Sequence, residues 1–184
     1  MITKLSALIL LALSSPLVLG FALAVQWVSP GPMLLRQPRV GRHGEVFRMW
    51  KLRTMVPDAA ERLDALLRAD PRARAQWQAY GWLRDDPRVA GRAARWARQH
   101  SIDELPQLLN VLAGGMALVG PRPILPSQAA QMAAPVRRAR ESVRPGMTGL
   151  WQVYGRSDMT LRQMVRLDRL YVGRRSVALD VHIL

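Results

Sequence analysis

The chain opens with a long apolar segment and continues as short elements rich in basic residues. Leu5 to Val25 contains 21 residues and no charge, which is about the length that an α-helix needs to cross the hydrocarbon of a bilayer. Pro16 lies near its middle, after Ser14 and Ser15. Because proline removes a backbone hydrogen bond and clashes with the preceding turn, we expect this helix to break at Ser15 and Pro16.

The N-terminal segment has three interpretations: a straight transmembrane helix, a signal peptide, or a re-entrant helix that enters one leaflet, bends and leaves by the same face. Ala22-Leu23-Ala24 resembles a signal-peptide cleavage site. The arginine-rich remainder should stay in the cytoplasm under the positive-inside rule, which argues against export. The residues alone leave the straight helix and the re-entrant helix open.

Alternation of apolar with basic or polar residues predicts a small β-hairpin next. Met33–Gln37 fits a short strand, Val40–Phe47 a hairpin with His43-Gly44 at its turn, and Trp50–Met55 a further strand. Side chains two residues apart in a strand point to the same face. We therefore expect Lys51 and Arg53 to lie together.

Helical periodicity dominates the rest of the chain. We expect helices over residues 57–83 with a break at Asp70-Pro71, 88–98, 108–112, 128–141 with an interruption at Pro135, and 160–172, and a loop over 144–149. Arg88, Arg92, Arg95 and Arg98 would form one helical stripe, which is either a solvated face or a basic surface over lipid headgroups or phosphates. The predicted fold class is mainly α with a small β-hairpin.

Composition narrows the partners. The 184 residues are 49% hydrophobic, yet the formal net charge is +14, which indicates partners that are both apolar and anionic. Nucleic acid is the simplest partner for such a charge. The chain has no cysteine, so disulfides and thiolate chemistry are excluded. Lys4 and Lys51 are the only lysines beside 25 arginines, which makes Lys51 a candidate functional residue.

Ser101-Ile102-Asp103-Glu104-Leu105-Pro106 has a structural and a catalytic interpretation. In the first, Ser101 and Glu104 form a capping box and Asp103 complements the helix dipole. In the second, one carboxylate of the adjacent pair attacks phosphorus while the other holds a divalent ion. The motif alone does not decide between them.

Ordered blocks along the chain resemble the bacterial sugar transferase family, the monotopic phosphoglycosyl transferases that begin glycan assembly on polyprenyl phosphate. The matching blocks are Ser29–Pro32, Arg39–Arg42, Lys51–Met55, Asp86–Val89, Ser101–Leu112, Met116–Pro123, Arg144–Leu150 and Leu167-Asp168. They span nearly the whole chain, which makes the resemblance far more specific than a lone Asp-Glu pair.

The resemblance implies an enzyme with a two-step mechanism. Asp103 would attack the β-phosphorus of a UDP-sugar, expel UMP and carry the sugar phosphate covalently, before polyprenyl (undecaprenyl) phosphate accepts it. Glu104 would hold Mg²⁺ against the diphosphate. Lys51, Arg98 and Arg122 match basic positions expected to line the phosphate site, and Arg53 joins them as a further expected phosphate ligand. Such sites suit phosphoryl transfer, which depends on charge neutralisation and positioning.

The resemblance also implies the architecture. Residues 1–28 would form a re-entrant membrane hairpin, broken at Ser15 and Pro16, and residues 29–184 a catalytic domain on the cytoplasmic face of the bacterial inner membrane, with interfacial amphipathic helices. We expect anionic lipids and no nucleic acid as partners, and no N-terminal helical bundle of the kind that larger members carry. A homo-oligomer is compatible with the sequence, which does not define the oligomeric state.

The segment 57–84 is longer than in the smallest family members and resembles those that use UDP-hexoses such as UDP-glucose or UDP-galactose. A UDP-hexose is therefore the expected donor for synthesis of a polysaccharide or glycoconjugate. The rival hypothesis is a membrane-anchored binding protein that uses its arginine surface on nucleic acid or acidic lipid, without catalysis.

Overall fold

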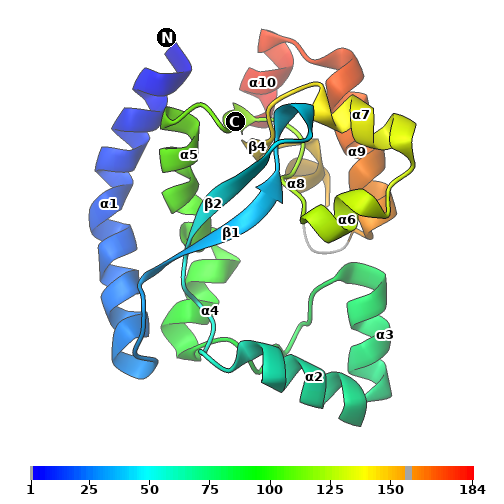
Figure 1. Ribbon diagram of the computed structural model, residues 1–184. Coiled ribbons are helices and arrows are strands. Elements are labelled where there is room, and N and C mark those ends of the chain that lie inside the picture. Colours follow the sequence, from blue (N-terminus) through cyan, green and yellow to red (C-terminus); the bar gives the residue numbers. More distant parts are fainter. Residues whose placement is uncertain (1, 156–158) are drawn as a thin grey trace.

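A computed structural model describes residues 2–155 and 159–184, and it confirms the mainly helical fold with a small β-hairpin. The elements are α1 (Ile2–Val28), β1 (Leu34–Val40), the 3-10 helix η1 (Arg42–Gly44), β2 (Val46–Leu52), α2 (Ala59–Ala69), α3 (Pro71–Tyr80), α4 (Gly91–Gln99), the 3-10 helix η2 (Ile102–Gln107), α5 (Leu108–Leu112), β3 (Ala117–Val119), α6 (Pro126–Ala130), α7 (Ala134–Glu141), β4 (Gly146–Thr148), α8 (Leu150–Tyr154), α9 (Leu161–Arg174) and α10 (Val177–Ile183). Figure 1 shows α1 along one side of the molecule, with α4 and α5 beside it.

The helix α1 continues through Pro16 without interruption, so the expected break at Ser15 and Pro16 is not present. Proline has no N–H to donate to the carbonyl four residues earlier, which is that of Ala12. The Ser15 hydroxyl donates to this carbonyl instead, at 2.9 Å. Side-chain replacement of the lost backbone hydrogen bond explains how the helix continues past the proline.

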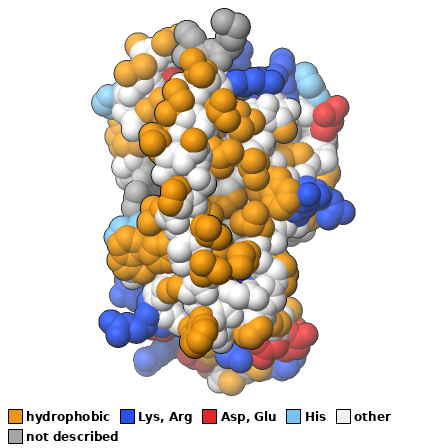
Figure 2. Space-filling view, turned by 90° about the vertical axis from the view of Figure 1, so that its left-hand side faces the viewer, with side chains coloured by type: hydrophobic (Ala, Val, Ile, Leu, Met, Phe, Trp, Pro, Cys, Tyr) orange, Lys and Arg blue, Asp and Glu red, His pale blue; other side chains and the backbone are white. Residues whose placement is uncertain are grey.

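One side of α1 contacts the rest of the protein near both of its ends. Ala7 lies in a buried cluster with Met49 and Leu108, whereas Ala22 lies in another with Leu52. Only 11% of the 18-residue apolar window of α1 is buried, although the helix is long and apolar enough to cross a membrane. Figure 2, which views the molecule from the α1 side, shows hydrophobic side chains over most of this face. This exposure excludes an ordinary core helix.

The predicted hairpin is present and brings the strand that carries Lys51 against η2. β1 and β2 pair antiparallel, with Leu35 opposite Lys51, and β2 lies against η2. His43 adopts a left-handed conformation with φ of 60°, and Gly44 follows with φ of 80°. Two consecutive positive φ values reverse the chain tightly, as expected for the His43-Gly44 turn.

The helical excursion after β2 has the predicted break. α2 ends at Ala69 and α3 begins at Pro71, with the Asp70 carboxylate accepting from the Arg72 N–H.

The expected arginine stripe is partly wrong, because α4 begins only at Gly91. Arg88 precedes it and is buried, with an ion pair to Asp86 at 2.7 Å.

The C-terminal third contains elements that the sequence pattern did not predict. The expected loop over 144–149 includes β4, which pairs parallel with β3. A Cβ atom on Gly146 would lie 2.0 Å from the Gly120 nitrogen. The two backbone segments therefore approach too closely for any residue other than glycine at position 146. α8 and α10 were also not expected, whereas α9 was, and the Thr160 side chain caps it.

Candidate active site

Asp103 and Glu104 lie in the 3-10 helix η2, and the capping-box interpretation of Ser101 is wrong. Ser101 has φ of 58° and its side chain makes no capping hydrogen bond. A capping residue needs an extended backbone to direct its oxygen at the first helical N–H groups. The two carboxylates are therefore free of a capping role, and Asp103 is only 3% exposed.

Lys51 joins the two carboxylates. Its Nζ lies 3.0 Å from Asp103 Oδ2 and 3.3 Å from Glu104 Oε1. The side chains of Lys51 and Glu104 are 19% and 20% exposed, whereas that of Asp103 is buried behind them. The ion pairs connect the end of β2 to η2.

The two carboxylates have pKa values shifted in opposite directions. Burial raises the pKa of Asp103, and the charge of Glu104 adds to this, while Lys51 and Arg98 oppose it. Burial also opposes ionisation of Glu104, but the charges of Lys51, Arg122 and Arg98 outweigh it, so the pKa of Glu104 lies below its ordinary value. Two acids whose pKa values are shifted apart in this way can take different roles. One can act as a base or nucleophile while the other remains an anion.

A pocket beside the pair is lined by cations, including one that the sequence analysis did not assign. Lys51, Glu104 and Arg122 line it together with Arg39 from β1. Burial, with the charge of Arg122, lowers the pKa of Arg39 to about 10. Arg39 still carries its charge at neutral pH. The signal that could have found it is the hairpin register, which places it on the same face as Lys51.

Arg98 and Arg122 lie near the Asp103–Glu104 pair. Both lie close enough to the pair to lower the pKa of Glu104. Arg98 comes from α4, which packs against η2. With Lys51 and Arg39, four cations surround two carboxylates, so the site has an excess of positive charge.

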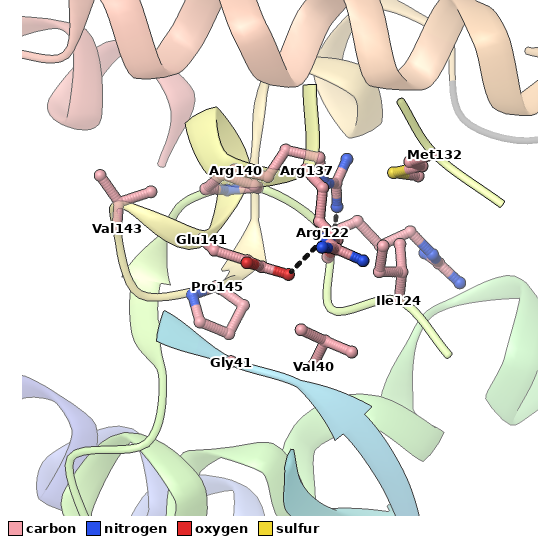
Figure 3. Close-up of a pocket in the computed structure, with 11 residues that line it drawn as sticks. Val40, Gly41, Arg122, Ile124, Met132, Arg137, Arg140, Glu141, Val143 and Pro145 are labelled. Atoms are coloured by element: carbon pink, nitrogen blue, oxygen red, sulfur yellow. Dashed lines mark hydrogen bonds and ion pairs between the residues drawn. The ribbon is translucent and has the colours of Figure 1, made fainter. Parts of the chain in front are cut away.

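Contacts on both sides hold Arg122 in place. Its guanidinium lies over the Trp151 ring, 4.4 Å from the centroid. The buried Arg140 donates to the Arg122 carbonyl and forms an ion pair with Asp168, which also accepts from the Arg122 backbone N–H. Figure 3 shows a second pocket, which is lined by Arg122 and Arg140. Arg122 also lines the first pocket, so the two pockets are neighbours.

Arg53 does not join this cluster, which corrects the expectation that it binds phosphate beside Lys51. β2 ends at Leu52, so the alternation that would align the two side chains stops before Arg53. Its buried guanidinium bonds to Ser29 and to the Pro32 carbonyl, at the end of α1. Arg53 therefore fixes the connection between α1 and the hairpin.

The donor set fits Mg²⁺ shared with a substrate. Among the described residues, no cluster of three or more His, Asp and Glu side chains is placed to hold a metal ion. Mg²⁺ is usually held by one or two carboxylates together with substrate phosphates. Glu104 supplies a carboxylate of this kind, and the surrounding cations suit a diphosphate.

The chain matches the bacterial sugar transferase family over residues 1–184. It is 44% identical over 154 residues to an undecaprenyl-phosphate galactose phosphotransferase of Salmonella typhimurium, covering 84% of this chain and 32% of that protein. It is 43% identical over 185 residues to a UDP-glucose:undecaprenyl-phosphate glucose-1-phosphate transferase of Caulobacter vibrioides, covering 97% and 63%. It is also 38% identical over 180 residues to the exopolysaccharide production protein ExoY of Rhizobium meliloti, covering 97% and 78%. The chain spans about a third of the length of several curated relatives that it matches.

The Arg140–Asp168 pair predicts a pH-dependent loss of stability. Burial raises the pKa of Asp168 to about 6, and Arg140 opposes this rise. In Arg140→Met the folded-state pKa rises further above the unfolded value, so stability is retained at low pH and lost as pH rises through that pKa. We expect a deficit of about 3–5 kcal/mol at pH 8, and a smaller one at pH 5.

Thermal unfolding in detergent at the two pH values measures this deficit. Arg138→Met is the matched control, because Arg138 is an exposed arginine of the same helix. An equal loss of unfolding free energy at both pH values would show that the unpaired charge of Asp168 is not the cause.

Proposed function

Because the chain belongs to the bacterial sugar transferase family, we propose that it transfers a sugar-1-phosphate from a UDP-sugar to polyprenyl phosphate and releases UMP. The observation that supports this most strongly is the Lys51 ammonium bound to both Asp103 and Glu104 beside an arginine-lined pocket. A site with two acids and an excess of cations suits a polyanionic diphosphate.

In the first step, a carboxylate oxygen of Asp103 attacks the β-phosphorus of the UDP-sugar. A new O–P bond forms, the bond from this phosphorus to the bridging oxygen breaks, and UMP leaves with the electron pair. Asp103 then carries the sugar phosphate as an acyl phosphate. The incoming diphosphate competes for the Lys51 ammonium that covers Asp103, which frees the buried carboxylate as substrate binds.

In the second step, a phosphate oxygen of polyprenyl phosphate attacks the same phosphorus. The acyl O–P bond breaks, the Asp103 carboxylate is restored, and the product is a polyprenyl diphosphate sugar. Arg122 is suited to hold the transferred phosphoryl group in both steps, because its backbone and side chain are fixed by Arg140, Asp168 and Trp151.

Glu104 is the proposed ligand of Mg²⁺. Its depressed pKa keeps it ionised, as a metal ligand requires. The metal would neutralise charge on the diphosphate as it develops on the leaving group. Lys51 and Arg98 would supply the remaining positive charge from the protein.

A UDP-hexose is the proposed donor, and polysaccharide initiation the proposed role. Relatives are named for undecaprenyl-phosphate galactose and glucose phosphotransfer and for exopolysaccharide production. α2 and α3 form the helical excursion that prompted the hexose expectation.

The proposed location is the cytoplasmic face of the bacterial inner membrane, with both ends of α1 on that side. Catalytic-domain residues pack against Ala7 near one end of α1 and Ala22 near the other. A helix that crossed the bilayer would carry one end away from a domain on a single side. The packing therefore supports a monotopic arrangement, while the exposed apolar face of α1 and the basic surface suit anionic lipids.

We predict that Asp103→Asn lowers UMP release by roughly a thousandfold or more, because the amide is not a nucleophile. Membrane association should be unchanged, since α1 is intact. UMP release from a panel of UDP-sugars, with polyprenyl phosphate present, measures the effect. Asp64→Asn, an exposed acid of α2, is the matched control. Similar turnover in the two variants would contradict the role of Asp103 as the nucleophile.

The topology predicts that Thr3→Cys is labelled from the cytoplasmic side. Thr3 is exposed and the chain has no cysteine, so a single thiol reports one position. Ser127→Cys, exposed on α6, marks the side of the catalytic domain. Both should react with an impermeant maleimide in inverted vesicles and neither in intact cells. Labelling of Thr3→Cys alone in cells would establish a spanning helix.

A further inference from the structure

A side chain forms hydrogen bonds with the edge of β2 that faces away from β1. β1 pairs with one edge of β2 in a two-stranded sheet. On the other edge, Asn110 Oδ1 accepts from the Trp50 backbone N–H at 2.9 Å, and Asn110 Nδ2 donates to the Arg48 carbonyl at 2.8 Å. The amide thus takes the place of a peptide group in a neighbouring strand.

Asn110 is itself held firmly. It lies in α5, is 8% exposed, and its backbone carbonyl accepts from the N–H groups of Gly115 and Met116. Met49 of β2 packs in the same buried cluster as the apolar residues of α5. The side-chain amide therefore projects from a fixed backbone onto β2.

The two residues bonded by Asn110, Arg48 and Trp50, lie in β2 immediately before Lys51. η2 runs directly into α5, so Asp103, Glu104 and Asn110 belong to one continuous segment. Besides the packing of Met49, this segment meets β2 through two polar contacts, the Lys51 ion pairs and the Asn110 amide. The second contact fixes where the Lys51 backbone lies relative to the two carboxylates.

We propose that Asn110 is a positioning residue of the active site, which holds β2 in the register that places the Lys51 ammonium between Asp103 and Glu104. The inference rests on the proposed function, because the placement matters for catalysis only if the pair transfers a phosphoryl group. A long, flexible lysine side chain needs a fixed backbone to return to one position. Asn110 supplies it through one donor and one acceptor.

The experiment compares Asn110→Ala, which removes both hydrogen bonds, with Asn110→Asp, which keeps an acceptor for Trp50 but no donor for Arg48. Tyr171→Phe is the control, because it removes buried hydrogen bonds to Val119 and Asp180 away from Lys51. We expect kcat for UMP release to fall roughly 10- to 100-fold in Asn110→Ala, with KM for the UDP-sugar changed by less than about threefold. Tyr171→Phe should keep kcat within about twofold at a temperature where all variants are folded.

Hydrogen exchange measured by mass spectrometry provides a readout independent of turnover. The peptide that contains Trp50 should exchange roughly fivefold faster or more in Asn110→Ala, and be less affected in Asn110→Asp. Unchanged exchange in both variants, or a kcat for Asn110→Ala within twofold of wild type, overturns the inference. Wild-type protein that releases no UMP from any UDP-sugar refutes the proposed function instead, and the exchange result still decides whether Asn110 fixes β2.

Discussion

One lysine ammonium shared by two carboxylates is the contact around which the site is organised. Asp103 is buried, and an ionised carboxylate there is costly unless a cation lies beside it. Lys51 is that cation, and it pairs with Glu104 as well. The hairpin and the η2–α5 segment must therefore meet in a single arrangement, because any other would separate these charges.

The charge balance of the pocket follows from this contact. Lys51 offsets part of the charge of the acidic pair, so Arg39, Arg98 and Arg122 leave the site positive overall. Each arginine comes from a different part of the chain, and Arg122 is held by a stacked tryptophan and a buried ion pair. A fixed excess of positive charge stabilises the charge of a transferring phosphoryl group without reorganisation at the moment of reaction.

Local patterns predicted the elements with short-range causes. Residues close together in the sequence explain the His43-Gly44 turn, the α2–α3 break at Pro71 and the start of α9. The parallel β3–β4 pair was missed because its strands are three residues long and nearly thirty residues apart. Arg53 was misplaced because the partners of its guanidinium, Ser29 and Pro32, lie far back in the sequence. The N-terminal helix was expected to break, and a serine hydroxyl that replaces one hydrogen bond explains why it does not.

The central claim is that Asp103, not merely its charge, takes part in the reaction. Mass spectrometry of the protein incubated with a UDP-hexose and Mg²⁺, without polyprenyl phosphate, tests it most directly. We predict a hexose phosphate on the peptide that contains Asp103, and its loss when polyprenyl phosphate is added. An Asp103 peptide that stays unmodified at every time point, in protein that releases UMP once polyprenyl phosphate is added, would contradict the account, because sugar phosphate would then pass to its acceptor without a covalent intermediate.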